Sequence, residues 1–292
     1  MGKPIEMDEK TLEAQLKKFD KFQLRALIEQ TKNPYVRLKK PEVNVNKNEV
    51  LIGIIGSTWL NHKYANLPFL HRLYDRHFKK EGVDFVIHAG DVTAPFNKTN
   101  ESLLYEQTPL RVPIYVAENY PKAKFKTYLV AGHSDKDYPI KTICKEYEFD
   151  HWDVCEEISR LREDLEYICS KERLTEGDIV IGSDPERQFK IKVLQLKPGA
   201  RVWGVSYVPQ KIVGSYATGV KPNMMVLNGL RTPYYHNFES RNIHVLLTGA
   251  CCNQTPEQRE YYRPANIGAW IVYIKIGKNN VEIQPTIIPA HV

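Results

Sequence analysis

The sequence lacks the segments that would place it in or across a membrane. No apolar run approaches the roughly 20 residues that span a bilayer, and residues 1–10 hold no apolar stretch of the kind that a signal peptide carries. The five cysteines are an odd number and include no Cys-x-x-Cys pair, which indicates reduced thiols and neither a disulfide framework nor a zinc site. These absences predict a cytoplasmic protein with no membrane partner.

Several signatures of catalysis are missing as well. The chain has no Gly-x-x-x-x-Gly-Lys-(Ser/Thr) loop and no Gly-x-Ser-x-Gly turn, and the lone pair Gly53 and Gly56 does not make a dinucleotide fingerprint. The sequence therefore argues against P-loop, dinucleotide-binding and α/β-hydrolase chemistry.

What the sequence does contain is an ordinary globular composition. Of its 292 residues, 42% are hydrophobic and 26% are charged, which suits a chain that buries a core without disulfides or metals. The 41 lysines and arginines exceed the 35 acids and give a net charge of +6. Such an excess suits a partner that carries phosphates, but it is also common on solvated surfaces, and charge alone favours the second interpretation.

The hydrophobic pattern divides the chain into a helical N-terminal extension with a linker, residues 1–49, and a domain, residues 50–292. Helical spacing of apolar residues predicts an amphipathic helix at 8–31, and prolines and asparagines indicate the linker at 33–49. Within the domain the same spacing predicts helices at 67–78 and at 153–173, the second capped by Asp153. Short apolar runs predict strands at 50–55, 84–88, 126–131, 178–182, 189–196, 201–207, 224–227, 243–248 and 269–276.

Four of these strands lead into loops that combine glycine with polar side chains, at 56–59, 90–91, 132–135 and 228–232. Their order and spacing resemble the motifs of the calcineurin-like metallophosphoesterases, and residues 206–213 and 248–259 resemble a phage and archaeal branch that includes nucleases. The resemblance implies an α/β fold, a four-layer α/β/β/α sandwich with two mixed β-sheets, preceded by the helical extension. It also implies a site in which about seven oxygen and nitrogen ligands hold two metal ions.

Placed on the family's motifs, the chain keeps one metal ligand, Asp91. The other positions at which the family has a ligand or its catalytic histidine are occupied here by Ser57, Trp59, His133, Ser134, Lys197, Leu230 and Thr232, and Asp135 follows the third motif. An indole or a leucine cannot coordinate a cation. The resemblance therefore implies a degenerate site with no catalytic residue, no metal and no cofactor.

Alternatives remain for the residues around Asp91. Its carboxylate is expected to pair with Lys197, whose ammonium would stand where a metal stood, or to bond a nearby amide. A reduced site is a further alternative, in which Asp91 and His133, with Asp135 and His62 nearby, hold a single divalent metal such as manganese. His88 is expected to be a core histidine with a satisfied hydrogen bond, and Cys251 and Cys252 are expected to be buried as small hydrophobic residues.

The favoured function is that of a catalytically inactive pseudo-metallophosphoesterase, a scaffold or accessory subunit in a larger assembly, for which association with nucleic acid is left open. Its protein partner would contact apolar residues such as Trp59, Leu230 and Tyr234. One alternative is a divergent metal-dependent phosphodiesterase or nuclease with the reduced metal site. Another is a non-catalytic nucleic-acid-binding accessory protein, whose contacts would come from the N-terminal helix through Lys17, Lys18, Lys21 and Arg25.

Overall fold

The computed structural model of the chain describes residues 42–147, 152–169, 175–196, 204–216, 221–260 and 265–290. The chain divides into two compact units, Met1–Arg37 and Leu38–Val292, and the described residues belong to the second. The helix expected at 8–31 lies outside the described residues, together with Lys17, Lys18, Lys21 and Arg25. None of the described helices is long and apolar enough to cross a membrane.

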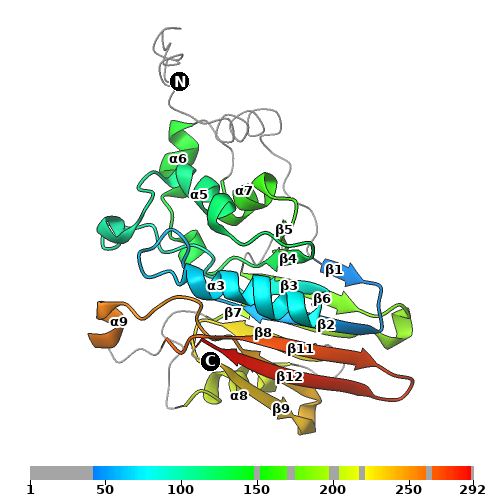
Figure 1. Cartoon of the computed structure of the whole chain (residues 1–292). Coiled ribbons are helices and arrows are strands. Elements are labelled where there is room, and N and C mark those ends of the chain that lie inside the picture. Colours follow the sequence, from blue (N-terminus) through cyan, green and yellow to red (C-terminus); the bar gives the residue numbers. More distant parts are fainter. Residues whose placement is uncertain are drawn as a thin grey trace. The chain divides into compact units, whose positions relative to one another are not determined.

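Two mixed six-stranded β-sheets form the centre of the second unit (Figure 1). The first sheet has the strand order β12-β11-β2-β3-β4-β5, in which β2 to β5 run parallel and β11 and β12 pair antiparallel. The second has the order β1-β6-β7-β8-β10-β9, with β7, β8 and β10 parallel. The predicted fold class, an α/β sandwich of two mixed sheets, is confirmed.

The strands of the first sheet are β2 (Glu49–Ile55), β3 (Phe85–His88), β4 (Lys126–Leu129), β5 (Leu165–Tyr167), β11 (Gly268–Ile276) and β12 (Val281–Pro289). Those of the second are β1 (Glu42–Val45), β6 (Glu176–Ile181), β7 (Phe189–Gln195), β8 (Met224–Asn228), β9 (Tyr234–Phe238) and β10 (Ile243–Leu247). The α-helices are α3 (Leu67–Arg72), α4 (Lys79–Glu81), α5 (Val112–Asn119), α6 (Ile140–Glu146), α7 (Val154–Leu161), α8 (Tyr207–Ser215) and α9 (Pro256–Glu260). A π-helical segment, η1 (Leu73–Phe78), joins α3 to α4, and the short 3-10 turns are η2 (Glu101–Leu103), η3 (Pro109–Arg111), η4 (Ser134–Lys136), η5 (Pro185–Arg187) and η6 (Glu239–Arg241).

The side chains of β8 alternate between two hydrophobic cores, because successive residues of a strand point to opposite faces of the sheet. Met224 and Val226 lie in the larger core, which also holds residues of the first sheet. Met225 and Leu227 lie in a smaller core with Val213 of α8. The helix α8 therefore covers the outer face of the second sheet. The larger core also takes side chains from α3, α5 and α7, which Figure 1 shows beside the first sheet.

The helix predicted at 153–173 is wrong beyond Leu161, although Asp153 caps it as expected by accepting from the Cys155 and Glu156 amides. Arg162 leaves the helical conformation, with φ −140° and ψ 115°. The strand β5 follows, and it pairs with β4. The helical spacing of Leu165 and Ile168 was misleading, since both are buried in and after this edge strand.

Two other predicted segments differ from the structure. Tyr207 begins α8 and does not end a strand, while residues 201–203 of that prediction lie outside the described residues. Residues 42–45, expected within the linker, form β1 and pair with β6, so the sandwich begins before residue 50. The strands β9 and β12 were not predicted from the sequence.

Candidate binding site at the strand ends

Strands from both sheets direct their carboxyl ends toward one place. The loops after β2, β3 and β4 bring Ser57, Asp91 and Ser134 there, while β7 and β8 end at Gln195 and Asn228. The Asp91 carboxylate accepts three hydrogen bonds, from Ser57 Oγ at 3.3 Å and Gln195 Nε2 at 3.2 Å on Oδ2, and from the Ser134 amide at 3.1 Å on Oδ1. Asp91 is 5% exposed and is surrounded by neutral donors.

Asn228 connects Asp91's neighbours to the end of β10. Its Nδ2 donates to the Gly90 carbonyl at 2.9 Å and to Gln195 Oε1 at 2.8 Å, and its Oδ1 accepts from Thr248 Oγ1 at 2.6 Å. Ser57 Oγ lies 3.1 Å from the same Oδ1 and has one hydrogen to share between Asn228 and Asp91. We call Ser57, Asp91, Gln195, Asn228 and Thr248 the Asp91 network.

The loops that carry this network have strained backbone. Ser57, Trp59, Asp91 and Arg231 all have φ between 49° and 56°, a left-handed conformation that costs a residue with a side chain free energy. Gly132 is required beside them, because a Cβ there would lie 2.1 Å from the Asp91 nitrogen. Such strain persists only where the surrounding contacts impose it, and it gathers at functional sites.

Asp135 ties the loop after β4 to the loop after β3. Its carboxylate accepts from the amides of Val92 (3.1 Å), Thr93 (2.7 Å) and Gly132 (2.6 Å), and from Thr93 Oγ1 at 2.8 Å. Burial and then the charge of Asp91 raise the pKa of Asp135 to about 7, against the lowering effect of these hydrogen bonds. Because its oxygens already accept four bonds, Asp135 serves the loops structurally.

His88 is a core histidine with satisfied hydrogen bonds, as predicted. Its Nε2 lies 3.0 Å from Thr58 Oγ1, which itself donates to the Val92 carbonyl, so the hydrogen between them belongs to His88. Its Nδ1 then accepts from the Gly90 amide at 3.4 Å. Burial lowers the pKa of His88 to about 3. Cys251 and Cys252 are buried as predicted.

A pocket of about 910 Å³ opens above the Asp91 network. Of the predicted residues, Trp59, Asp91, His133 and Ser134 line it. Ser57 and Asp135 lie beneath it, bonded to Asp91 and to the loop after β3. The guanidinium of Arg231 lies over the Trp59 ring, 4.0 Å from its centre.

Two further predicted positions, Leu230 and Thr232, do not line this pocket. Leu230 packs into the smaller core and is 9% exposed, so it is not the surface contact that was expected. Thr232 donates its hydroxyl to the Leu230 carbonyl. Lys197 lies outside the described residues, and the described partner of Asp91 at the end of β7 is the Gln195 amide.

Sequence reasoning did not single out the side chains of Gln195, Arg231 and Thr248. The available signal was positional: each ends or follows a strand whose neighbours lead into the same edge of its sheet. Chain position alone could not indicate that Gln195 would face Asp91 from the other sheet, because that contact depends on how the sheets stack.

The described residues around Asp91 do not fit a dinuclear metal centre. Two divalent cations need several oxygen or nitrogen ligands with free lone pairs, whereas Ser57 and Gln195 direct hydrogens toward Asp91. Within the described ranges, no group of three or more His, Cys, Asp and Glu side chains could hold a metal ion.

A search of solved structures found proteins that align with most of this chain but share little sequence identity with it. A conserved protein from Streptococcus pneumoniae, described as a predicted phosphoesterase, is 11% identical, with 82% of this chain and 98% of that chain covered and a TM-score of 0.35. Vps29 from Entamoeba histolytica, solved with zinc, is 11% identical, with 81% of this chain and 98% of that chain covered and a TM-score of 0.38. GAP50 of Plasmodium is 9% identical, with 84% of this chain and 86% of that chain covered and a TM-score of 0.41. No protein-family model and no curated protein matches the chain. Likenesses this distant carry no argument about function, so the function has to be inferred from the described side chains.

Proposed function

We propose that this chain is a non-catalytic protein with a metallophosphoesterase-type sandwich, and that it acts as a scaffold or accessory subunit by binding a protein partner. The observation that carries the proposal is the Asp91 network. The one carboxylate at a position where the family has a metal ligand is bonded by a hydroxyl, a side-chain amide and a main-chain amide.

These donors cannot easily turn into ligands. Gln195 would have to rotate its amide to offer Oε1 to a cation, but Oε1 accepts from Asn228 Nδ2 at 2.8 Å. Rotation would place two N–H groups against each other, and a buried donor without an acceptor costs about 1–3 kcal/mol. The network is therefore stable without a cation, and introducing one would break several of its bonds.

The site also has no group suited to protonate a leaving alcohol where the family's catalytic histidine falls. Ser134 stands there, and its main-chain amide serves the Asp91 carboxylate. A serine hydroxyl is too weak an acid to serve as a general acid at neutral pH, because an efficient general acid has a pKa near the working pH. The strained loops and the open pocket remain, and these features suit binding without chemistry.

A reduced metal site is the second candidate, and one observation favours it: Asp91 and His133 line the same pocket. In this alternative a single divalent ion, held by both side chains, would support phosphodiester hydrolysis.

The two candidates are separated by an assay of the full-length protein with bis(p-nitrophenyl) phosphate and with single-stranded DNA in excess manganese. We expect no turnover above that of buffer with manganese. Asp91→Asn serves as the matched variant, because it keeps the shape of the side chain and removes its charge. Metal-dependent turnover by the wild type that disappears in Asp91→Asn would overturn the proposal in favour of the reduced site.

A further inference from the structure

Three buried hydrogen-bond donors belong to side chains that lie together beside the pocket, and two of these side chains, Trp59 and Arg231, line it. They are Trp59 Nε1, His62 Nε2 and one terminal nitrogen of Arg231, and none has an acceptor among the described residues. Buried polar groups in folded proteins are nearly always bonded. Donors without an acceptor in the described chain take their acceptors from water or from a bound molecule.

The three side chains are in contact through Trp59. The Arg231 guanidinium lies 4.0 Å from the centre of the Trp59 ring, and the ring of His62 meets Trp59 edge-on, with 5.3 Å between the ring centres. His62 Nδ1 accepts from the Tyr64 amide at 3.1 Å, so the hydrogen of the neutral ring is on Nε2. Burial, and then the charge of Arg231, lowers the pKa of His62 to about 4, which keeps the ring neutral at pH 7.

Arg231 is the charged member of this group. It is 7% exposed and lines the pocket, and none of the ion pairs in the described part of the chain includes it. Contact with an aromatic face stabilises a cation by only about 0.5–2 kcal/mol, while removing a charge from water costs several kcal/mol. A guanidinium held in this way needs an anion.

We propose that the pocket binds a carboxylate from an acidic peptide segment of a partner protein, with Arg231 as its ion-pair partner. The guanidinium centred over the Trp59 ring still has an N–H without an acceptor, and a guanidinium binds a carboxylate through two parallel hydrogen bonds. Leu103, Leu196 and Pro95 line the same pocket and would contact apolar side chains of the segment. This inference rests on the proposed function as a binding subunit.

The charges of the pocket select a monoanion. Lys136 adds a second positive group to Arg231, but Asp91 and Asp137 line the same pocket. A carboxylate, with one negative charge, meets less repulsion from these two acids than a phosphate monoester or the doubly charged form of inorganic phosphate.

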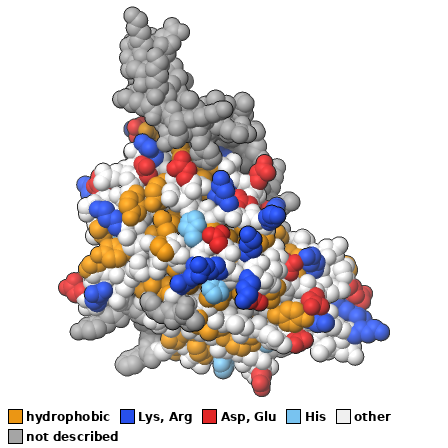
Figure 2. Space-filling model, in the orientation of Figure 1, with side chains coloured by type: hydrophobic (Ala, Val, Ile, Leu, Met, Phe, Trp, Pro, Cys, Tyr) orange, Lys and Arg blue, Asp and Glu red, His pale blue; other side chains and the backbone are white. Residues whose placement is uncertain are grey.

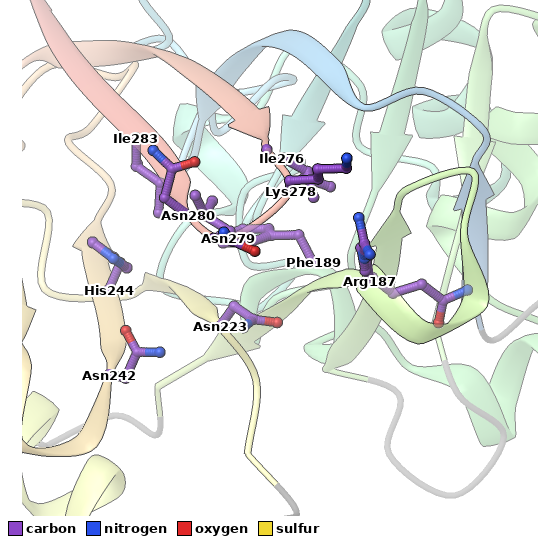
Figure 3. Close-up of a pocket in the computed structure, with 13 residues that line it drawn as sticks. Arg187, Phe189, Asn223, Asn242, His244, Ile276, Lys278, Asn279, Asn280 and Ile283 are labelled. Carbon is purple, nitrogen blue, oxygen red and sulfur yellow. The ribbon is translucent and has the colours of Figure 1, made fainter.

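Another pocket in the described part of the chain lacks these features. It has a volume of about 460 Å³ and lies at the other ends of β8 and β10, where Figure 3 shows Arg187, Asn223 and His244. Asn223 Oδ1 accepts from the Lys190 amide, and His244 Nδ1 lies 2.7 Å from the Tyr235 hydroxyl. Arg187 is exposed and pairs with Asp184, so it provides a control arginine.

The test is a selection of random displayed peptides against the full-length protein, followed by measurement of the affinity of the selected peptides. We expect enrichment of sequences that join Asp or Glu to apolar residues. Their binding should weaken roughly 30-fold in Arg231→Gln, the effect of losing one partner of a buried charge pair, and less in Arg231→Lys. Arg187→Gln should bind as the wild type does. Acetate should compete better than inorganic phosphate at equal concentration.

Thermal unfolding of Arg231→Gln shows whether the variant is folded, and the competition by acetate and phosphate uses the wild type alone. Failure to enrich acidic peptides, equal binding by Arg231→Gln in folded form, or stronger competition by phosphate would each overturn the inference. None of these results bears on hydrolysis with manganese, so the proposed absence of catalysis is tested separately by that assay.

Discussion

At the scale of single residues, the surroundings of Asp91 distinguish a metal site from a hydrogen-bonded network at the ends of the strands. A carboxylate that holds a metal is surrounded by other ligands with free lone pairs, whereas Asp91 is surrounded by hydrogen-bond donors. Its contribution should therefore be one of stability, through the bonds that join the two sheets.

Asp91→Asn should lower the free energy of unfolding by about 2 kcal/mol, because the new amide sets an N–H against a donor and leaves one of them unsatisfied. Urea denaturation measures this. Asp137→Asn, an exposed side chain bonded to Asn97, should stay within about 0.5 kcal/mol of the wild type. An Asp91→Asn protein more stable than the wild type would indicate a carboxylate held at a cost to folding, as functional acids are.

His88 gives a prediction about pH. Its pKa is about 3 in the folded protein and 6.5 in the unfolded chain, so below pH 6.5 the unfolded chain takes up a proton that the native state does not. Its contribution to stability is therefore complete above pH 6.5 and is lost as pH falls toward 3, at about 1.4 kcal/mol per pH unit.

Urea denaturation of His88→Gln at pH 8.0, 6.5 and 5.0 tests this, because glutamine keeps a donor and an acceptor but takes up no proton. Relative to its value at pH 8.0, the variant should lose about 2 kcal/mol less than the wild type by pH 5.0. The raised pKa of Asp135 changes the pH dependence of stability in the opposite direction. Asp135 is present in both proteins, so its effect cancels when the two are compared. Parallel pH dependences would contradict the assignment of His88 as a buried neutral group.

At the scale of elements, Arg162 explains why α7 ends where it does. It is 8% exposed, donates to the carbonyls of Ala117, Tyr120 and Pro121, and pairs with Asp164 at 2.6 Å. These bonds fix the end of α5 against the start of β5.

Arg162→Met should lower the free energy of unfolding by about 3 kcal/mol, since it leaves several buried carbonyl groups and one carboxylate without their donor. Lys47→Met breaks the exposed Lys47–Asp84 pair and should cost less than about 1 kcal/mol. Both are measured by urea denaturation, and similar losses in the two variants would show that Arg162 does not join the elements.

The elements differ in how well the sequence predicted them, for physical reasons. The strands β2 and β3 were predicted because parallel strands buried on both faces are nearly continuous apolar runs. The break at Arg162 was not, because its carbonyl partners lie about forty residues away in the chain. The loop positions of Ser57, Asp91 and Ser134 were predicted from motif spacing, whereas the approach of Gln195 and the stack of Arg231 on Trp59 depend on contacts between sheets and loops.

At the scale of the whole molecule, the net charge of +6 does not by itself indicate a nucleic-acid partner. On the face drawn in Figure 2, basic and acidic side chains are interspersed among hydrophobic ones. The remaining argument for nucleic acid is the run of N-terminal lysines, which lies outside the described residues.

Charge removal at Lys17, Lys18 and Lys21 tests that alternative. We expect the full-length protein to bind single-stranded DNA only weakly, and the triple substitution to glutamine to leave that binding and its salt dependence unchanged in filter-binding assays. Binding whose salt slope falls by about 0.7 for each lysine removed would favour a nucleic-acid-binding accessory role.

The most direct measurement is a calorimetric titration of chelator-treated full-length protein with manganese, alongside Asp91→Asn. If the Asp91 network has replaced the metal centre, the wild type shows no saturable site and the two proteins give the same trace. A stoichiometric site in the wild type that is absent from Asp91→Asn would contradict this, and would restore Asp91 as a metal ligand.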